Sequence, residues 1–175
     1  MSSFGSGLGV LVALALAAPA GAAQSGCAGA GEIPARGAED RAVAALECVL
    51  NEERAERGRP RVHAQPQLQR AAERHARDMV RRRYFSHTTP EGRTFDERLV
   101  AYTHGFTWKV GETLAWGGRS KATPEAIVRA WLDSPSHRRV LLDADYRDVG
   151  IGVVRGLPLS TGPGATYAAD YGVRH

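Results

Sequence analysis

The feature that most constrains the fold is a short run near the C-terminal end, residues 149–153, with the sequence Val-Gly-Ile-Gly-Val. Alternation with a period of two predicts a β-strand, and the tiny residues leave one face flat enough for close approach by another element. Residues 166–171 alternate in a similar way, and a loop with two prolines, residues 156–164, separates the two runs. Together these segments predict a β-hairpin with a long connection.

Helical patterns come before these strands. Apolar residues recur at helical spacing from Glu39 until Gly58 and Pro60, and Pro66 begins a second helix whose inner face includes His75. On that face His75 is expected to be a hydrogen-bonded core histidine. Residues 110–116 are a third strand candidate. Helices first and strands late indicate an α+β fold.

Three further helix starts carry capping signals. Thr94 forms a Thr-x-x-Glu capping box, and Thr123 precedes a proline in the same way that Ser134 does. We expect the hydroxyl of Ser134 to accept a hydrogen bond from a backbone N–H in the first turn of the helix that follows.

The N-terminal residues predict export. Residues 8–18 are apolar but shorter than the roughly 20 residues that span a bilayer, and an Ala-x-Ala site follows near residue 23. We expect a signal peptide over 1–23, a flexible tail over 24–38 and one domain over 39–175. The mature protein has no predicted transmembrane segment and would be secreted or associated with the cell wall. A lipid anchor on Cys27 is the alternative, although residues 24–26 match a lipoprotein cleavage box poorly.

The cysteine count fits an oxidising compartment. Cys27 and Cys48 are the only two, and an even pair in an exported chain favours a disulfide. Closing a loop of about 20 residues stabilises a fold by about 3 kcal/mol in the chain-entropy model. One buried and one exposed thiol is the alternative.

Composition suits a globular domain with a basic surface. Apolar residues make up 43% of the chain, the formal net charge is +4, and Lys109 and Lys121 are the only lysines. An arginine-rich surface permits contact with anionic polymers, although a simply solvated surface has the same composition.

Four segments stand out as carriers of chemistry: Tyr-Phe-Ser-His at 84–87, Val-Gly-Glu-Thr-Leu-Ala-Trp-Gly at 110–117, Ala-Trp-Leu-Asp-Ser-Pro-Ser-His-Arg at 130–138, and the two late strands. In this order they resemble the CAP (SCP-like) superfamily of cysteine-rich secretory, antigen 5 and pathogenesis-related proteins, in its bacterial secreted branch. The resemblance implies a three-layer α-β-α sandwich with a central antiparallel sheet. It also implies a cleft lined by histidines and acidic residues.

Site residues of the family are assigned to this sequence only at positions that match a family motif. His87 matches the first family histidine, Glu112 the glutamate of the Gly-Glu-Asn element, and His137 the histidine of the Ser-Pro-Gly-His element. Thr113 replaces the usual asparagine. The second glutamate of the animal and plant branches has no match, and Glu125 is a candidate substitute whose simpler role is favourable charge in the first turn of a helix.

The chemistry of these residues favours weak metal binding. His137 lies in a first helical turn, where the positive helix end disfavours imidazolium and keeps the ring ready to ligate a metal. His87 and His137 with water could hold a divalent ion such as Zn²⁺ weakly, since stable sites usually have three or four protein ligands. Nucleophilic catalysis has little support, because no Gly-x-Ser-x-Gly elbow is present.

We therefore expect an extracytoplasmic ligand-binding or interaction module, with a lipid, a cell-wall polymer or a protein as ligand and no nucleic acid. An enzyme is less favoured. The alternative function is a divalent-metal-dependent hydrolase in which Glu112 acts as base or orienting group. A third class is a wall-associated protein that binds polymer through its arginines.

Overall fold

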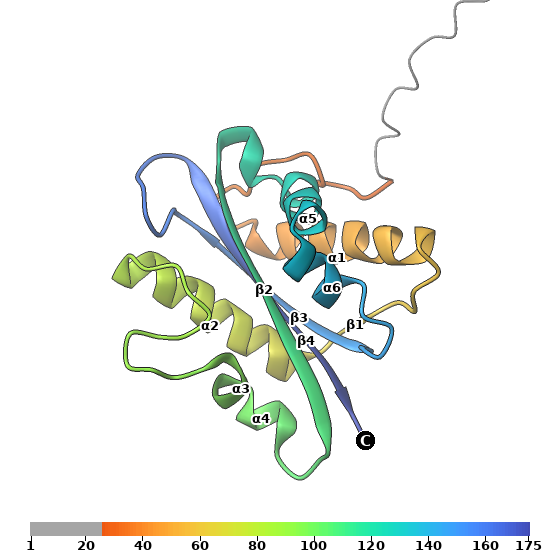
Figure 1. Cartoon of the computed structure of the whole chain (residues 1–175). Coiled ribbons are helices and arrows are strands. Elements are labelled where there is room, and N and C mark those ends of the chain that lie inside the picture. The colour runs from red at the N-terminus through yellow and green to blue at the C-terminus, as the bar shows by residue number, and fades with distance from the viewer. Residues whose placement is uncertain (1–25) are drawn as a thin grey trace, which may run out of the picture.

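The computed structural model describes residues 26–175, so the predicted signal peptide over 1–23 lies outside the described residues. The elements follow one another along the chain as Figure 1 shows. They are α1 (Glu39–Glu56), β1 (His63–Ala64), α2 (Pro66–Arg82), α3 (Phe95–Arg98), α4 (Val100–Thr103), β2 (Trp108–Gly118), the 3-10 helix η1 (Arg119–Ala122), α5 (Pro124–Asp133), α6 (Pro135–Leu141), β3 (Asp148–Arg155) and β4 (Gly164–Arg174). None of the helices in this part of the chain is long and apolar enough to cross a bilayer.

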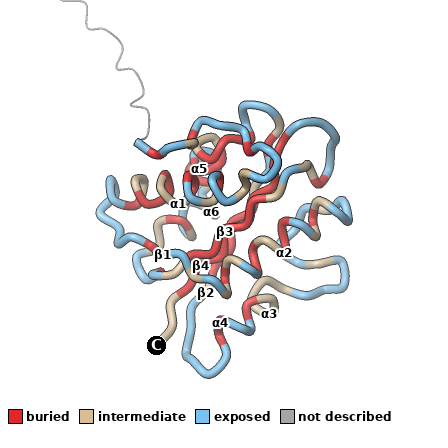
Figure 2. Tube along the Cα trace, turned by 180° about the vertical axis from the view of Figure 1, so that it is seen from behind, coloured by how far each residue is buried: buried red, intermediate tan, exposed pale blue. Residues whose placement is uncertain are grey.

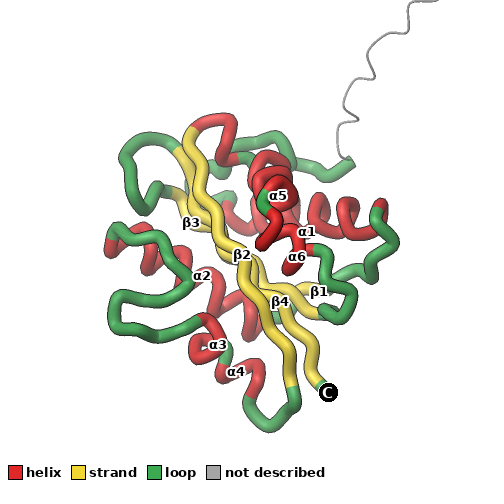
Figure 3. Tube along the Cα trace, in the orientation of Figure 1, coloured by secondary structure: helices red, strands yellow, loops and turns green. Residues whose placement is uncertain are grey.

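The architecture is a three-layer α-β-α sandwich, which confirms the predicted fold class. Helices α1, α5 and α6 cover one face of the sheet, and α2, α3 and α4 cover the other (Figures 1 and 3). Buried segments concentrate in the strands between these two layers (Figure 2). The strand order is β1-β3-β4-β2, which makes β2 an edge strand.

The sheet is mixed, whereas a purely antiparallel sheet was expected. The three long strands are antiparallel to one another, but β1 pairs in parallel with β3, with His63 opposite Asp148. The amides of His63 and Gln65 donate to the carbonyls of Arg147 and Val149 at 2.8 Å each. A two-residue strand has too few positions to show a period of two in the sequence.

The glycines of β3 bring α2 into backbone contact with the sheet. A Cβ atom at Gly150 would lie 2.0 Å from the amide nitrogen of Gln69, and one at Gly152 would lie 2.3 Å from that of Glu73. No side chain fits in this space, which confirms the flat face predicted from the alternation. The position of α2, and of every side chain it presents, is thereby fixed against β3.

The capping predictions were right at two helix starts and wrong at one. The Thr123 hydroxyl accepts from the amide of Ala126 at 3.2 Å, and the amide of Thr94 donates to Glu97 at 2.9 Å. Ser134 caps no backbone amide, because its hydroxyl meets that of Ser136 at 3.2 Å. The Ser134 hydroxyl thus pairs with the side chain of Ser136, a contact that the Ser-Pro signal alone does not predict.

Part of the segment predicted as a tail is packed against the domain. Cys27 and Ala30 are buried, and the carbonyl of Ala30 accepts from the amide of Glu125 at 3.0 Å. Cys27 and Cys48 form a disulfide with their Cα atoms 5.7 Å apart, as the cysteine count favoured. The bridge ties this segment to α1.

The last turn of α1 contains a buried arginine that no sequence pattern had singled out. Arg54 is fully buried and donates to the carbonyls of Pro60 at 2.7 Å, Leu141 at 2.5 Å and Asp143 at 3.0 Å. It thus satisfies carbonyl groups at and just beyond the end of α6. Burial lowers the pKa of Arg54, although the neighbouring Tyr171 and Asp143 oppose that effect.

The disulfide gives the first prediction. Unreduced, denatured protein should show no free thiol on titration. Replacing both cysteines with serine should lower the free energy of unfolding by about 3 kcal/mol, because the unfolded chain regains the freedom of the closed loop. Chemical denaturation of the two proteins measures this difference, and two titratable thiols per wild-type chain would contradict the bridge.

Candidate functional site

The structure brings together three of the residues singled out by the sequence. His87 lies in the loop after α2, Glu112 lies within β2, and His137 lies in the first turn of α6. His87 Nδ1 lies 2.7 Å from Glu112 Oε1, and the imidazole centroids of His87 and His137 are 6.4 Å apart. Because β2 is an edge strand, elements from both helical layers meet beside it.

Glu112 is a buried carboxylate with both oxygens engaged. Its side chain is 1% exposed, Oε1 accepts from His87, and Oε2 accepts from the guanidinium of Arg98. Burial by itself would raise the pKa of Glu112, but the hydrogen bond from His87 and the charge of Arg98 together hold that pKa below its usual value. Glu112 therefore carries a negative charge inside the fold.

Arg98 is a site residue that sequence reasoning missed. It is the last residue of α3, its side chain is 9% exposed, and it donates both to Glu112 and, at 2.7 Å, to the carbonyl of His87. The capping box at Thr94 predicts the helix that presents Arg98. Nothing local in the sequence identifies what Arg98 binds.

Asp170 was also missed, and it lies beside Glu112. The two residues are directly opposed in the register of β2 and β4, and Asp170 is fully buried. Its oxygens accept no hydrogen bond within residues 26–175. Burial, followed by the charge of Glu112, raises the pKa of Asp170 well above its usual value. These opposite shifts favour a negative charge on Glu112 and a proton on Asp170.

His137 is a neutral ligand candidate. Burial and the proximity of His87 both lower the pKa of His137. Together with its place at the start of α6, this keeps a ring nitrogen available to a metal or to a hydrogen-bond donor.

Glu125, the remaining candidate, and His75, the predicted core histidine, make their contacts with other residues. Glu125 pairs with Arg129 at 2.6 Å, one turn along α5, and no hydrogen bond or ion pair among the described residues joins it to His87, Glu112 or His137. His75 is 2% exposed, and its Nε2 donates to the carbonyl of Ser86 at 2.9 Å, as expected of a core histidine.

The donor set of His87 and His137 fits a divalent ion with few protein ligands. Glu112 holds His87 Nδ1 and leaves Nε2 free, which is the usual orientation for a metal-binding histidine. Two imidazoles on one tetrahedral Zn²⁺ have centroids about 5 Å apart, so His87 and His137 must close by about 1 Å. His87 is half exposed and has room to move.

Among residues 26–175, no third ligating side chain groups with His87 and His137. In the part of the chain that the structure describes, one group of three metal-ligating side chains has its ligand atoms within 4.8 Å of one another. It consists of Cys27, Cys48 and Glu52, and its two cysteines are bonded in the disulfide.

Fold and site together define a protein class, and comparison with known proteins identifies it. The family model described as "Cysteine-rich secretory protein family" (CAP) matches residues 49–161, more than half of the chain. This chain therefore belongs to the CAP family.

Bacterial proteins are among its relatives. YkwD of Bacillus subtilis is 32% identical over 108 residues, which are 61% of this chain and 40% of that protein. The membrane protein YlbC of the same organism is 35% identical over 81 residues, 46% of this chain and 22% of that protein. The matches thus span less than half of each relative.

Solved structures share the fold. An outer surface protein of Borrelia burgdorferi aligns with a TM-score of 0.63 and 25% identity, covering 74% of this chain and 90% of that one. An extracellular protein of Bacillus anthracis that contains an SCP domain aligns with a TM-score of 0.61 and 25% identity, covering 75% and 42%.

The carboxyl pair gives a prediction about stability. The pKa of Asp170 is raised by folding, so its contribution to stability is full below the unfolded pKa of about 4 and is lost as pH rises toward the folded pKa. Asp170→Asn keeps the shape of the protonated acid and removes this loss. The variant should melt at a higher temperature than wild type at pH 8, and the difference should shrink toward pH 4.

Asp133→Asn is the matched control, because Asp133 is exposed. Thermal melts across pH 4–8 should show no comparable gain for this variant. A lower melting temperature for Asp170→Asn at pH 8 would mean that Asp170 is ionised and held by a favourable contact.

Proposed function

We propose that this chain acts outside the cytoplasm as a ligand-binding module whose cleft at His87, Glu112 and His137 takes a divalent cation such as Zn²⁺ weakly. One observation carries the proposal. The 2.7 Å contact of His87 Nδ1 with the buried carboxylate of Glu112 leaves Nε2 available on a ring whose centroid lies 6.4 Å from that of His137. Glu112 also balances the charge of a bound cation through the same hydrogen bond.

Two protein ligands imply modest affinity, with water completing the coordination. The family resemblance adds a lipid as a candidate ligand, the arginine-rich surface adds a cell-wall polymer, and a protein ligand is the third candidate. A cation held by two histidines would present its open positions to such a ligand.

A hydrolase is less well supported than a binding module. A general base needs a free oxygen within reach of water. Both oxygens of Glu112 are already engaged, one with His87 and one with Arg98, and the side chain is 1% exposed. Glu112 is therefore better placed to orient His87 than to activate water.

Three observations support export. The first 23 residues have the composition of a signal peptide, the Cys27–Cys48 disulfide suits an oxidising compartment, and two structural neighbours are described as outer surface or extracellular proteins. Mass spectrometry of the protein recovered from the culture medium or cell wall of an expressing host tests this. An N-terminus near residue 24 would support export, and intact chain confined to the cytoplasm would contradict it.

Zinc titration tests the cleft. Isothermal titration calorimetry near neutral pH should show weak binding of one Zn²⁺ per chain. His87→Ala and His137→Ala should each abolish it, because each removes one of the two protein ligands.

His104→Ala is the matched control, since His104 is exposed and lies in the turn after α4. It should leave zinc binding unchanged. Retention of zinc binding by both His87→Ala and His137→Ala would contradict a shared site.

A further inference from the structure

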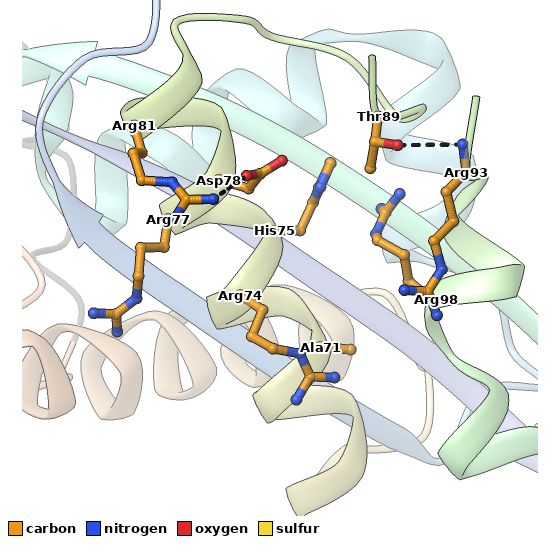
Figure 4. A pocket seen from close by; sticks show the side chains of 9 residues that line it. All are labelled: Ala71, Arg74, His75, Arg77, Asp78, Arg81, Thr89, Arg93 and Arg98. Atoms are coloured by element: carbon orange, nitrogen blue, oxygen red, sulfur yellow. Dashed lines mark hydrogen bonds and ion pairs between the residues drawn. The ribbon is translucent and has the colours of Figure 1, made fainter. Parts of the chain in front are cut away.

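A hollow lies between α2 and the segment that leads into α3 (Figure 4). Its volume is about 360 Å³, which is within the range of small-molecule sites. One wall comes from α2 and the facing wall from residues 89–98. Five guanidinium groups and one carboxylate, that of Asp78, line it, and three of the five form ion pairs with Glu73, Asp78 and Glu112. The five are Arg74, Arg77, Arg81, Arg93 and Arg98.

Two of these arginines are free to bind an anion. Arg77 pairs with Glu73, and Arg81 pairs with Asp78 at 3.1 Å. Arg93 instead donates to the neutral backbone carbonyl of Glu97 at 2.9 Å. Arg74 forms no ion pair within residues 26–175, and Figure 4 shows its side chain along the α2 wall.

Two buried nitrogen atoms in the lining also lack partners. Arg98 Nε has no acceptor, and His75 Nδ1 has no partner of either kind, within the described part of the chain. Both side chains are at least nine-tenths buried. A buried polar atom without a partner costs about 1–3 kcal/mol, so its presence in the wall of a cavity indicates a ligand.

Arg98 Nε and His75 Nδ1 need different kinds of ligand atom. Arg98 Nε is a donor and needs an acceptor oxygen. His75 Nε2 already donates to the carbonyl of Ser86, so His75 Nδ1 is an acceptor in the neutral ring and needs a donor. Burial lowers the pKa of His75, which keeps the ring neutral.

We propose that this hollow is a binding site for a phosphomonoester. A phosphate group has several acceptor oxygens for Arg74, Arg93 and Arg98, and guanidinium groups match its geometry. Its monoanionic form also carries a P–OH, which can donate to His75 Nδ1. The volume leaves room for a small organic group beyond the phosphate.

The site is separate from the histidine cleft but shares a wall with it. Arg98 uses its terminal nitrogens on Glu112 and on the carbonyl of His87, and its Nε belongs to the hollow. Failure of the zinc prediction would therefore leave this proposal standing, because neither Arg74 nor Arg93 touches His87 or His137.

Calorimetry with three defined anions tests the proposal: inorganic phosphate, sn-glycerol 3-phosphate and sulfate, at low ionic strength and about pH 6, near the second pKa of a phosphomonoester, so that monoanions with a P–OH are present. Both phosphate compounds should bind, and sulfate should bind at least ten-fold more weakly because it has no hydroxyl to donate to His75. Tighter binding of glycerol 3-phosphate than of phosphate would indicate an ester as the natural ligand, and the reverse order would indicate free phosphate. Equal binding of sulfate and phosphate would overturn the assigned role of His75 and with it the proposal.

Arginine variants show whether binding occurs at this site. Arg74→Gln and Arg93→Gln should each weaken phosphate binding about ten-fold or more, and both positions are exposed, so folding should be retained. Arg70→Gln is the matched control, because Arg70 is exposed on the same helix one turn away and does not line the hollow. An equal loss in all three variants would show general charge attraction and would contradict the site.

Discussion

The buried charge of Glu112 is the interaction on which the functional half of the molecule depends. A carboxylate that is 1% exposed is unfavourable unless it is paired and hydrogen-bonded. Arg98 supplies the ion pair and His87 a hydrogen bond, and both residues belong to the segment between α2 and β2. Glu112 thus fixes the segment between α2 and β2, and with it the positions of His87 and Arg98.

Two backbone features make this arrangement possible. Gly150 and Gly152 let α2 lie directly on β3, so the arginines and His75 of α2 have a fixed distance from the sheet. The edge position of β2 then allows the loop after α2 and the first turn of α6 to meet beside Glu112. The histidine cleft and the arginine-lined hollow lie on either side of Arg98, and His75 is linked to the loop through the carbonyl of Ser86.

Much of this could be predicted from the sequence where the signal is local. Alternation marked β3 and β4, the Thr-Pro and Thr-x-x-Glu signals marked two helix starts, and the resemblance to CAP proteins brought His87, Glu112 and His137 into one cleft. What was missed depends on contacts between distant segments. In the alternating pattern of β4, Asp170 lies on the side opposite Tyr167 and Tyr171, which suggests an exposed position. Both faces of β4 are buried, however, and only the register with β2 shows that Asp170 lies beside Glu112. Arg98 is similar, because its partners are 11 and 14 residues away.

The tautomers of two histidines test the central role of Glu112 most directly. Two-dimensional ¹H–¹⁵N NMR of the imidazole rings distinguishes Nδ1–H from Nε2–H in the neutral form, and His87→Ala and His75→Ala assign the signals. The account predicts that neutral His87 carries its proton on Nδ1, donated to Glu112, whereas neutral His75 carries its proton on Nε2, donated to Ser86. A neutral His87 protonated on Nε2 would contradict the account, because Glu112 would then not hold the ring.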